Sequence, residues 1–168
     1  MMGVGKTTVG KILAKKLQLK FIDIDRAIEK KEKSTIKKIF NNKGEAYFRE
    51  IEQRTTLLEL KKNNLVIALG GGAFIDKLIR SEVKKSSISF WLDLDMVSLL
   101  SRLKNTNKRP LLDNDNLYQT INKIYYKRKK IYNESDYRIK CNSMSIEEIT
   151  NQIFKLYEIR RNKNKKFD

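Results

Sequence analysis

The sequence predicts an α/β fold, with three layers α/β/α in which a central parallel sheet lies between helices. Short apolar runs alternate along the chain with segments of helical periodicity. Apolar runs of this kind are typical of parallel strands that are covered on both faces. Six of the seven glycines fall in three short clusters, MMGVGKTT, GEAYFRE and ALGGGAF, which indicates that the backbone approaches a ligand or turns sharply there.

Each element is predicted in order from its own pattern. Apolar residues at helical spacing predict a helix from Thr7, and Ser34 is a suitable N-cap for the long helix that ends at residue 62. The other helices are expected at residues 27–33, 74–85, 95–103, 117–134 and 145–161. Strands are expected at residues 19–25, 65–69, 88–94 and 137–141.

The first glycine cluster is predicted to be a phosphate-binding loop. It ends in Gly-Lys-Thr-Thr and leads directly into the first helix, whose free N–H groups and dipole favour anions. Lys6 is expected to reach the β and γ phosphates of a nucleotide, and the Thr7 hydroxyl to face Mg²⁺. A chance Gly-Lys-Thr at a helix start is the alternative.

The start of this motif differs from the usual pattern. The full motif has a further glycine five positions before Gly5, and an apolar strand before that glycine. Three explanations stay open: an internal Met taken as the start, a fragment, or a chain that lacks this central strand. The first two are favoured, because loss of a buried parallel strand exposes ladder groups and apolar faces of its neighbours.

Composition excludes several classes of function. The chain has no histidine, so Ser-His, Cys-His and His-ligated zinc chemistry are excluded, whereas phosphoryl transfer needs only Lys, Arg, carboxylates, amides and a metal. The single cysteine, Cys141, fits a reducing compartment, and no apolar run is long enough for a membrane span. A cytoplasmic location is expected, and the incomplete motif leaves organellar targeting open.

The net charge of +17 raises the possibility of nucleic-acid binding. Lysines are spread along the chain without interleaved aromatic residues, which favours a solvated surface over a nucleic-acid patch. One domain is expected over residues 1–160, and the basic tail 161–168 is expected to be disordered.

Two carboxylates and four arginines are further candidates. Asp23 and Asp25 alternate at the end of the first predicted strand, so both can face one site, although Asp25 is also a suitable helix cap. Planar guanidinium groups bind carboxylates and phosphates bidentately, which lysine cannot do. The arginines beside motif features are Arg49, Arg102, Arg109 and Arg128.

Six ordered motifs resemble those of the shikimate kinases, small P-loop kinases of the nucleoside-monophosphate-kinase type. They are GVGKTT, FIDID, GEAYFREIE, ALGGGA, RPLL and RKKIY, and the resemblance runs from Met1 to about Arg160. It implies the P-loop kinase fold with a lid at about residues 103–116. It also implies ATP-dependent phosphorylation of the 3-hydroxyl of shikimate, a step of aromatic amino-acid biosynthesis, by an expected monomer.

The resemblance also implies a role for each motif residue. ATP would be bound by Gly3, Val4, Gly5, Lys6, Thr7, Thr8, Arg102 and Arg109. Shikimate would be bound by Asp25, Arg49, Gly70, Gly71, Gly72 and Arg128. Thr7 and Asp23 would hold Mg²⁺. Lys6, Asp25 and Arg109 would be catalytic, with Arg109 on the lid.

Some assignments have alternatives. Arg102 could face solvent, Gly70 to Gly72 could form a simple turn, and Glu52 could either hold Arg49 or form a surface pair. The segment KCNSMS lacks the arginine and proline that often line the adenine side in the family, so nucleotide contacts there are not predicted. Another small-molecule kinase on the same fold, and a basic nucleic-acid-binding protein, are the rival functions.

Overall fold

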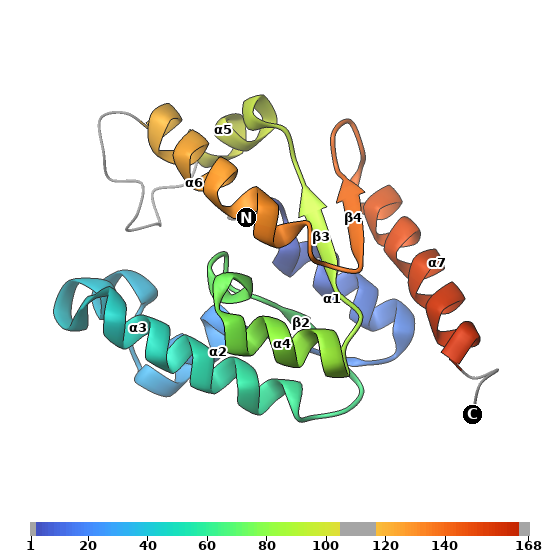
Figure 1. Ribbon diagram of the computed structural model, residues 1–168, viewed down its shortest axis with the longest axis horizontal. Coiled ribbons are helices and arrows are strands. Elements are labelled where there is room, and N and C mark those ends of the chain that lie inside the picture. The colour runs from blue at the N-terminus through green and yellow to red at the C-terminus, as the bar shows by residue number, and fades with distance from the viewer. Residues whose placement is uncertain (1–2, 105–116, 165–168) are drawn as a thin grey trace.

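The computed structural model describes residues 3–104 and 117–164 (Figure 1). The strands are β1 (Lys20–Asp23), β2 (Leu65–Ala68), β3 (Phe90–Asp93) and β4 (Tyr137–Lys140). The helices are α1 (Lys6–Leu17), α2 (Ile24–Glu32), α3 (Ile36–Leu60), α4 (Lys77–Ser86), α5 (Met96–Lys104), α6 (Leu117–Tyr132) and α7 (Ile146–Asn164), with a short 3-10 helix, η1 (Ala73–Ile75). Strands and helices alternate, which confirms the predicted α/β class.

The strands form two separate parallel pairs. In the first pair Lys20 lies opposite Leu65, and in the second Phe90 lies opposite Tyr137. Across the described residues no ladder joins β2 to β3. The single central sheet that the sequence predicts is therefore divided, because no described strand lies between these two pairs.

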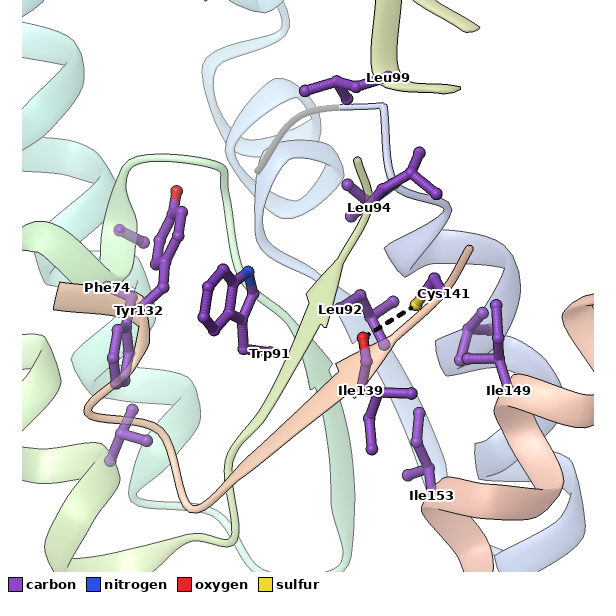
Figure 2. Packing of buried hydrophobic residues seen from close by; sticks show 14 of the residues in the cluster. Phe74, Trp91, Leu92, Leu94, Leu99, Tyr132, Ile139, Cys141, Ile149 and Ile153 are labelled. Carbon is purple, nitrogen blue, oxygen red and sulfur yellow. Dashed lines mark hydrogen bonds between the residues drawn. The ribbon is translucent and has the colours of Figure 1, made fainter. Parts of the chain in front are cut away.

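Helices cover the strand pairs on both sides. Figure 1 shows α1 beside α7, and α2, α3 and α4 grouped on the other side of β1 and β2. The larger core lies around β3, β4, α1 and α7, and Figure 2 shows Trp91, Ile139 and Ile149 within it. A smaller core joins α2 to α3 and contains Ile24, Ile28, Ile39 and Phe48.

Several boundaries differ from those predicted. The cap of α3 is Thr35, whose hydroxyl accepts a hydrogen bond from the Lys38 amide, and Ser34 precedes it. The helix predicted at residues 74–85 is divided because Asp76 is extended and its carboxylate accepts hydrogen bonds from the Leu78 and Ile79 amides, the free donors of a new helix start.

The C-terminal helix is longer than predicted. α7 continues through Asn164, so residues 161–164 of the segment expected to be disordered are helical, while residues 165–168 lie outside the described part. Basic residues in the last turn interact favourably with the helix dipole, which supports this extension. No helix within residues 3–104 and 117–164 combines the length and apolarity that crossing a membrane requires.

Candidate active site

The loop before α1 has the backbone conformation of an anion site. Gly5 is the N-cap of α1 with φ 89° and ψ 16°, which is the left-handed region that glycine adopts without strain. The amides of the first helical turn thus begin directly after the loop. A cavity of about 190 Å³ lies there, lined by Gly3, Gly5, Lys6, Thr7, Thr8, Asp23, Asp25 and Leu69.

Val4 differs from the other loop residues. Its side chain is 2% exposed and belongs to the larger core, so it fixes the loop against the body of the protein. Of the predicted loop residues, it alone does not line the cavity.

Two oxygen-bearing side chains that are suited to bind a metal ion lie beside the loop. The Thr7 hydroxyl donates a hydrogen bond of 2.5 Å to the Asp23 carboxylate, which joins the start of α1 to the end of β1. The other Asp23 oxygen accepts from the Arg26 amide at 3.3 Å and caps α2. Hydroxyl and carboxylate oxygens are ligands that Mg²⁺ accepts, usually with several waters, so this pair fits a magnesium ion.

Asp25 occupies a position that the sequence did not predict. The strand ends at Asp23, and Asp25 lies in the first turn of α2. The cap of this helix is Asp23, so the alternative in which Asp25 is the cap is wrong. Both carboxylates nevertheless line the same cavity, as predicted, because the helix begins at the carboxyl end of the strand.

The triple glycine passes close to charged side chains. A Cβ atom on Gly70 would collide with carboxylate oxygens of Glu52 and Asp25, and one on Gly72 would collide with the Arg49 guanidinium group. The glycines therefore let the loop lie against α3 and the start of α2.

Gly71 contributes its carbonyl group. The oxygen accepts a hydrogen bond of 2.7 Å from Arg128 and a second, short one from the Tyr132 hydroxyl. Arg128 and Tyr132 are four residues apart on α6, so they lie on one face of that helix. These contacts fix the glycine loop against α6, which brings Arg128 to the same site as Arg49.

Arg49 is held by two carboxylates. Its guanidinium group donates to Glu52 at 2.6 Å and to Glu45 at 3.0 and 3.1 Å, and it lies over the Phe48 ring. The Arg49 side chain is 32% exposed, whereas that of Glu52 is 3% exposed. All three guanidinium nitrogens therefore donate to carboxylates, Nη1 to the buried Glu52 and Nε and Nη2 to the more exposed Glu45.

Glu52 has an unusual electrostatic environment. Burial is the largest influence and raises the pKa of its carboxyl group, and nearby Asp25 acts in the same direction. The positive charges of Arg49 and Arg128 lower this pKa, but the net direction is upward. Of the two alternatives, Glu52 thus holds Arg49 from inside and is not a surface pair.

Of the remaining predicted residues, Arg102 is not among those that line the phosphate cavity. Arg102 is exposed on α5, where its charge acts on Cys141, whose pKa burial raises to about 11. Arg109 and most of the predicted lid lie outside the described residues.

Tyr132 is the site residue that the sequence did not single out. It belongs to the RKKIY motif, and its spacing of four from Arg128 was the available signal. Its side chain is 6% exposed and packs against Trp91, and burial raises the pKa of its hydroxyl.

Comparisons with known proteins agree with this geometry. The family model for shikimate kinase matches residues 2–158. A shikimate kinase from Persephonella marina is 42% identical over 152 residues, which are 90% of this chain and 92% of that protein. One from Sulfurihydrogenibium is 40% identical over 152 residues, with 90% of each chain covered.

Solved structures give the same result. A shikimate kinase from Acinetobacter baumannii in complex with shikimate superposes with a TM-score of 0.91 at 33% identity, covering 95% of this chain and 89% of that one. A shikimate kinase from Bacteroides thetaiotaomicron gives a TM-score of 0.86 at 31% identity, covering 94% of both chains. The chain belongs to the shikimate kinase family.

Proposed function

We propose that this chain transfers the γ-phosphoryl group of ATP to the 3-hydroxyl of shikimate, giving shikimate 3-phosphate and ADP. In this reaction the hydroxyl oxygen forms a bond to the γ phosphorus, and the bond from that phosphorus to the oxygen bridging to the β phosphate breaks. The hydroxyl proton is transferred to a carboxylate. Asp25 is suited to accept it, because its side chain lines the phosphate cavity.

The phosphate side uses the loop and the start of α1. The loop amides and Lys6 bind the phosphates of ATP, and Lys6 offsets the charge that develops on the transferring group. Thr7 and Asp23 would hold Mg²⁺, which supplies positive charge to the phosphates when bound. The catalytic role of Arg109 and the adenine contact of Arg102 remain predictions from the family resemblance.

The substrate side uses the two arginines around the glycine loop. Arg49 and Arg128 bind the carboxylate of shikimate, for which guanidinium groups have matching geometry. Asp25 and the amides near Gly71 face the ring hydroxyls. The complex of the Acinetobacter baumannii relative with shikimate supports a shikimate site in this fold.

One observation carries the proposal. Asp25 lines the phosphate cavity and also lies against Gly70, beside Glu52 and Arg49. A phosphate-binding loop and a pair of arginines are thus joined through one carboxylate. This order of groups fits a substrate that has a hydroxyl at one end and a carboxylate at the other.

The test is ADP release by the purified chain with MgATP, in the presence and absence of shikimate, after circular dichroism has shown a folded protein. We expect release that depends on shikimate. Lys6→Met should lower kcat at least about 100-fold, because one preorganised charge at the transferring group is worth that much. Near-normal turnover of this variant, or release that shikimate does not change, would contradict the proposal.

A conservative change tests the substrate side separately. Arg49→Lys keeps the charge and removes the bidentate geometry, so KM for shikimate should rise about tenfold, equivalent to about 1.4 kcal/mol, while KM for ATP stays unchanged. Arg54→Lys is the control, because Arg54 is exposed on the same helix. An unchanged KM for shikimate in Arg49→Lys would show that Arg49 does not bind the carboxylate.

A further inference from the structure

The two carboxylates that bind Arg49 differ in their exposure to solvent. Glu52 is 3% exposed, and its Oε2 accepts a hydrogen bond from Nη1 at 2.6 Å. The Glu45 side chain is 55% exposed, and its Oε1 accepts from Nε at 3.1 Å and from Nη2 at 3.0 Å. The contact with Glu52 is therefore part of the protein interior, whereas the contact with Glu45 is open to solvent.

Glu45 occupies the part of Arg49 that is best suited to a ligand. Nε and Nη2 form one edge of the planar guanidinium group, and a carboxylate fits such an edge with one oxygen on each nitrogen. Glu45 instead places a single oxygen against both nitrogens. A ligand carboxylate that binds this edge has to replace Glu45, and its two oxygens give a better match than the one oxygen of Glu45.

Arg49 keeps two other contacts when Glu45 leaves. The bond from Nη1 to Glu52 is on a different nitrogen from the two that Glu45 binds. The guanidinium carbon also lies 5.1 Å from the centre of the ring of Phe48, which is buried in the smaller core. The guanidinium group therefore stays in position while the carboxylate on its exposed edge is exchanged.

Glu45 remains in a favourable environment after it leaves Arg49. Gly44 has φ 80° and ψ 171°, which interrupts the helical conformation of α3, so Glu45 is the first residue of the segment that follows. A carboxylate in the first turn of a helical segment interacts favourably with the free amides and the dipole there. An exposed ion pair usually changes an equilibrium constant by about fivefold or less, so its replacement by a ligand costs little.

We propose that Glu45 is an internal competitor for the carboxylate site of Arg49. Its side chain occupies the edge formed by Nε and Nη2 in the free protein and leaves this edge when the carboxylate of shikimate binds. The inference rests on the proposed function, in which Arg49 binds that carboxylate. Glu45 thus weakens the binding of shikimate, and a ligand without a carboxylate does not displace it.

An ordinary supporting role of Glu45 is the alternative. Glu45 and Arg49 are four residues apart, and oppositely charged pairs at this spacing stabilise helices. A supporting Glu45 would orient Arg49 for its ligand, so its removal would raise KM for shikimate. A competing Glu45 has the opposite effect, because its removal leaves the edge free. The sign of the change in KM therefore separates the two roles.

Glu45→Gln tests the proposal, because the amide keeps the shape of the side chain and removes its charge. KM for shikimate should fall about two- to fivefold, while KM for ATP stays unchanged. The dissociation constant for shikimate, measured by isothermal titration calorimetry without ATP, should fall by a similar factor, and this measurement involves no turnover. An unchanged or raised dissociation constant would overturn the proposal.

Two controls separate displacement from a general effect of charge. Glu50→Gln removes the same charge from an exposed position on the same helix, and its KM for shikimate should stay near that of wild type. The methyl ester of shikimate has no charged carboxylate, so Glu45→Gln should not bind it more tightly than wild type does. Equal effects of the two variants, or an equal gain for the ester and the acid, would overturn the proposal.

The same measurements distinguish this inference from the proposed function. If neither wild type nor the variants bind shikimate or release ADP in response to it, the proposed function and the inference are both wrong. If wild type turns over shikimate and Glu45→Gln does not bind it more tightly, the inference alone is wrong, and Arg49 binds its ligand with Glu45 in place.

Discussion

At the scale of single residues, Glu52 connects the two halves of the site. Its buried carboxylate holds the Arg49 guanidinium group at 2.6 Å and lies against the glycine loop at Gly70, on the side where Asp25 approaches. A buried charge is tolerated when a partner and hydrogen bonds compensate for lost hydration. Glu52 is thus suited to orient Arg49 for its ligand while touching neither the phosphates nor the reacting hydroxyl in the proposed complex.

Glu52→Gln tests this positioning role. The amide keeps the shape but removes the charge, so Arg49 should be less firmly oriented, and KM for shikimate should rise about tenfold with a smaller effect on kcat. Steady-state kinetics with each substrate varied in turn would measure this. Glu50→Gln is the matched control, since Glu50 is exposed on the same helix. Equal kinetic constants for the Glu52 variant and wild type would exclude the role.

Wild type and the Glu52→Gln variant should also differ in how their stability depends on pH. Because burial raises the pKa of Glu52 in the folded state, the folded protein binds its proton more tightly than the unfolded chain. The resulting contribution to stability is present below the pKa of the unfolded carboxyl group and is lost as pH rises through the raised value. The urea midpoint of wild type relative to Glu52→Gln should therefore fall as the pH rises from about 4, the ordinary pKa of an unfolded glutamate. If the urea midpoint of wild type instead rises with pH relative to that of Glu52→Gln, folding lowers the pKa of Glu52.

Local motifs made part of the site predictable. Glycines, Lys6 and Thr7 are recognisable because the loop and helix start are encoded by consecutive residues. The contact of Tyr132 with the Gly71 carbonyl joins residues 61 positions apart, and periodicity cannot report such a distance. The burial of Glu52 could not be predicted from the sequence either, because glutamate is a residue type that is almost never fully buried unless it is paired.

At the scale of elements, Gly44 divides α3 into two segments. It has φ 80° and ψ 171°, a conformation essentially limited to glycine, and no atom lies within contact distance of the Cβ that another residue would add. The residues EAYFRE, 45–50, follow directly, so this bend sets the direction of the segment that presents Glu45 and Arg49. The glycine is required by backbone conformation and not by lack of space.

Gly44→Ala should therefore destabilise the protein by about 1–3 kcal/mol, the usual cost of such a conformation for a residue with a side chain. Urea unfolding followed by circular dichroism would measure the change. Asn42→Ala, at an exposed helical position of α3, should be neutral or slightly stabilising. If both variants have wild-type stability, the bend does not depend on glycine.

Elements were predicted better than their ends. Every strand and helix expected from periodicity in the described regions is present, because the apolar pattern reports which faces are buried. The ends of helices depend on their caps. Whether Ser34 or Thr35 is the cap of α3 depends on one hydrogen bond, which the apolar pattern of the sequence does not report. Asp25 was placed on a strand for the same reason, since a helix that starts directly after a strand leaves no turn signal.

At the scale of the whole molecule, composition predicted the class but not the division of the strands into two pairs. Each strand in isolation is short and apolar, and its partner is determined by the elements around it. The absence of a described strand between β2 and β3 leaves half-buried apolar residues on β2, which lowers the surface area that folding buries. The free energy of unfolding should therefore be sensitive to other properties of the whole chain, and the high net charge is the most prominent of these.

The net charge of +17 should make the folded protein more stable in salt. Like charges repel more strongly in a compact state than in an unfolded chain, whereas the ion pairs here are mostly at the surface, where each contributes little. Raising KCl from about 0.01 M to about 1 M shortens the screening length from about 30 Å to about 3 Å, so the urea midpoint should rise. The double variant Lys11→Glu and Lys38→Glu lowers the positive charge at two exposed positions, and its midpoint should change less with salt. A midpoint that falls as KCl is added would mean that ion pairs outweigh repulsion in this protein.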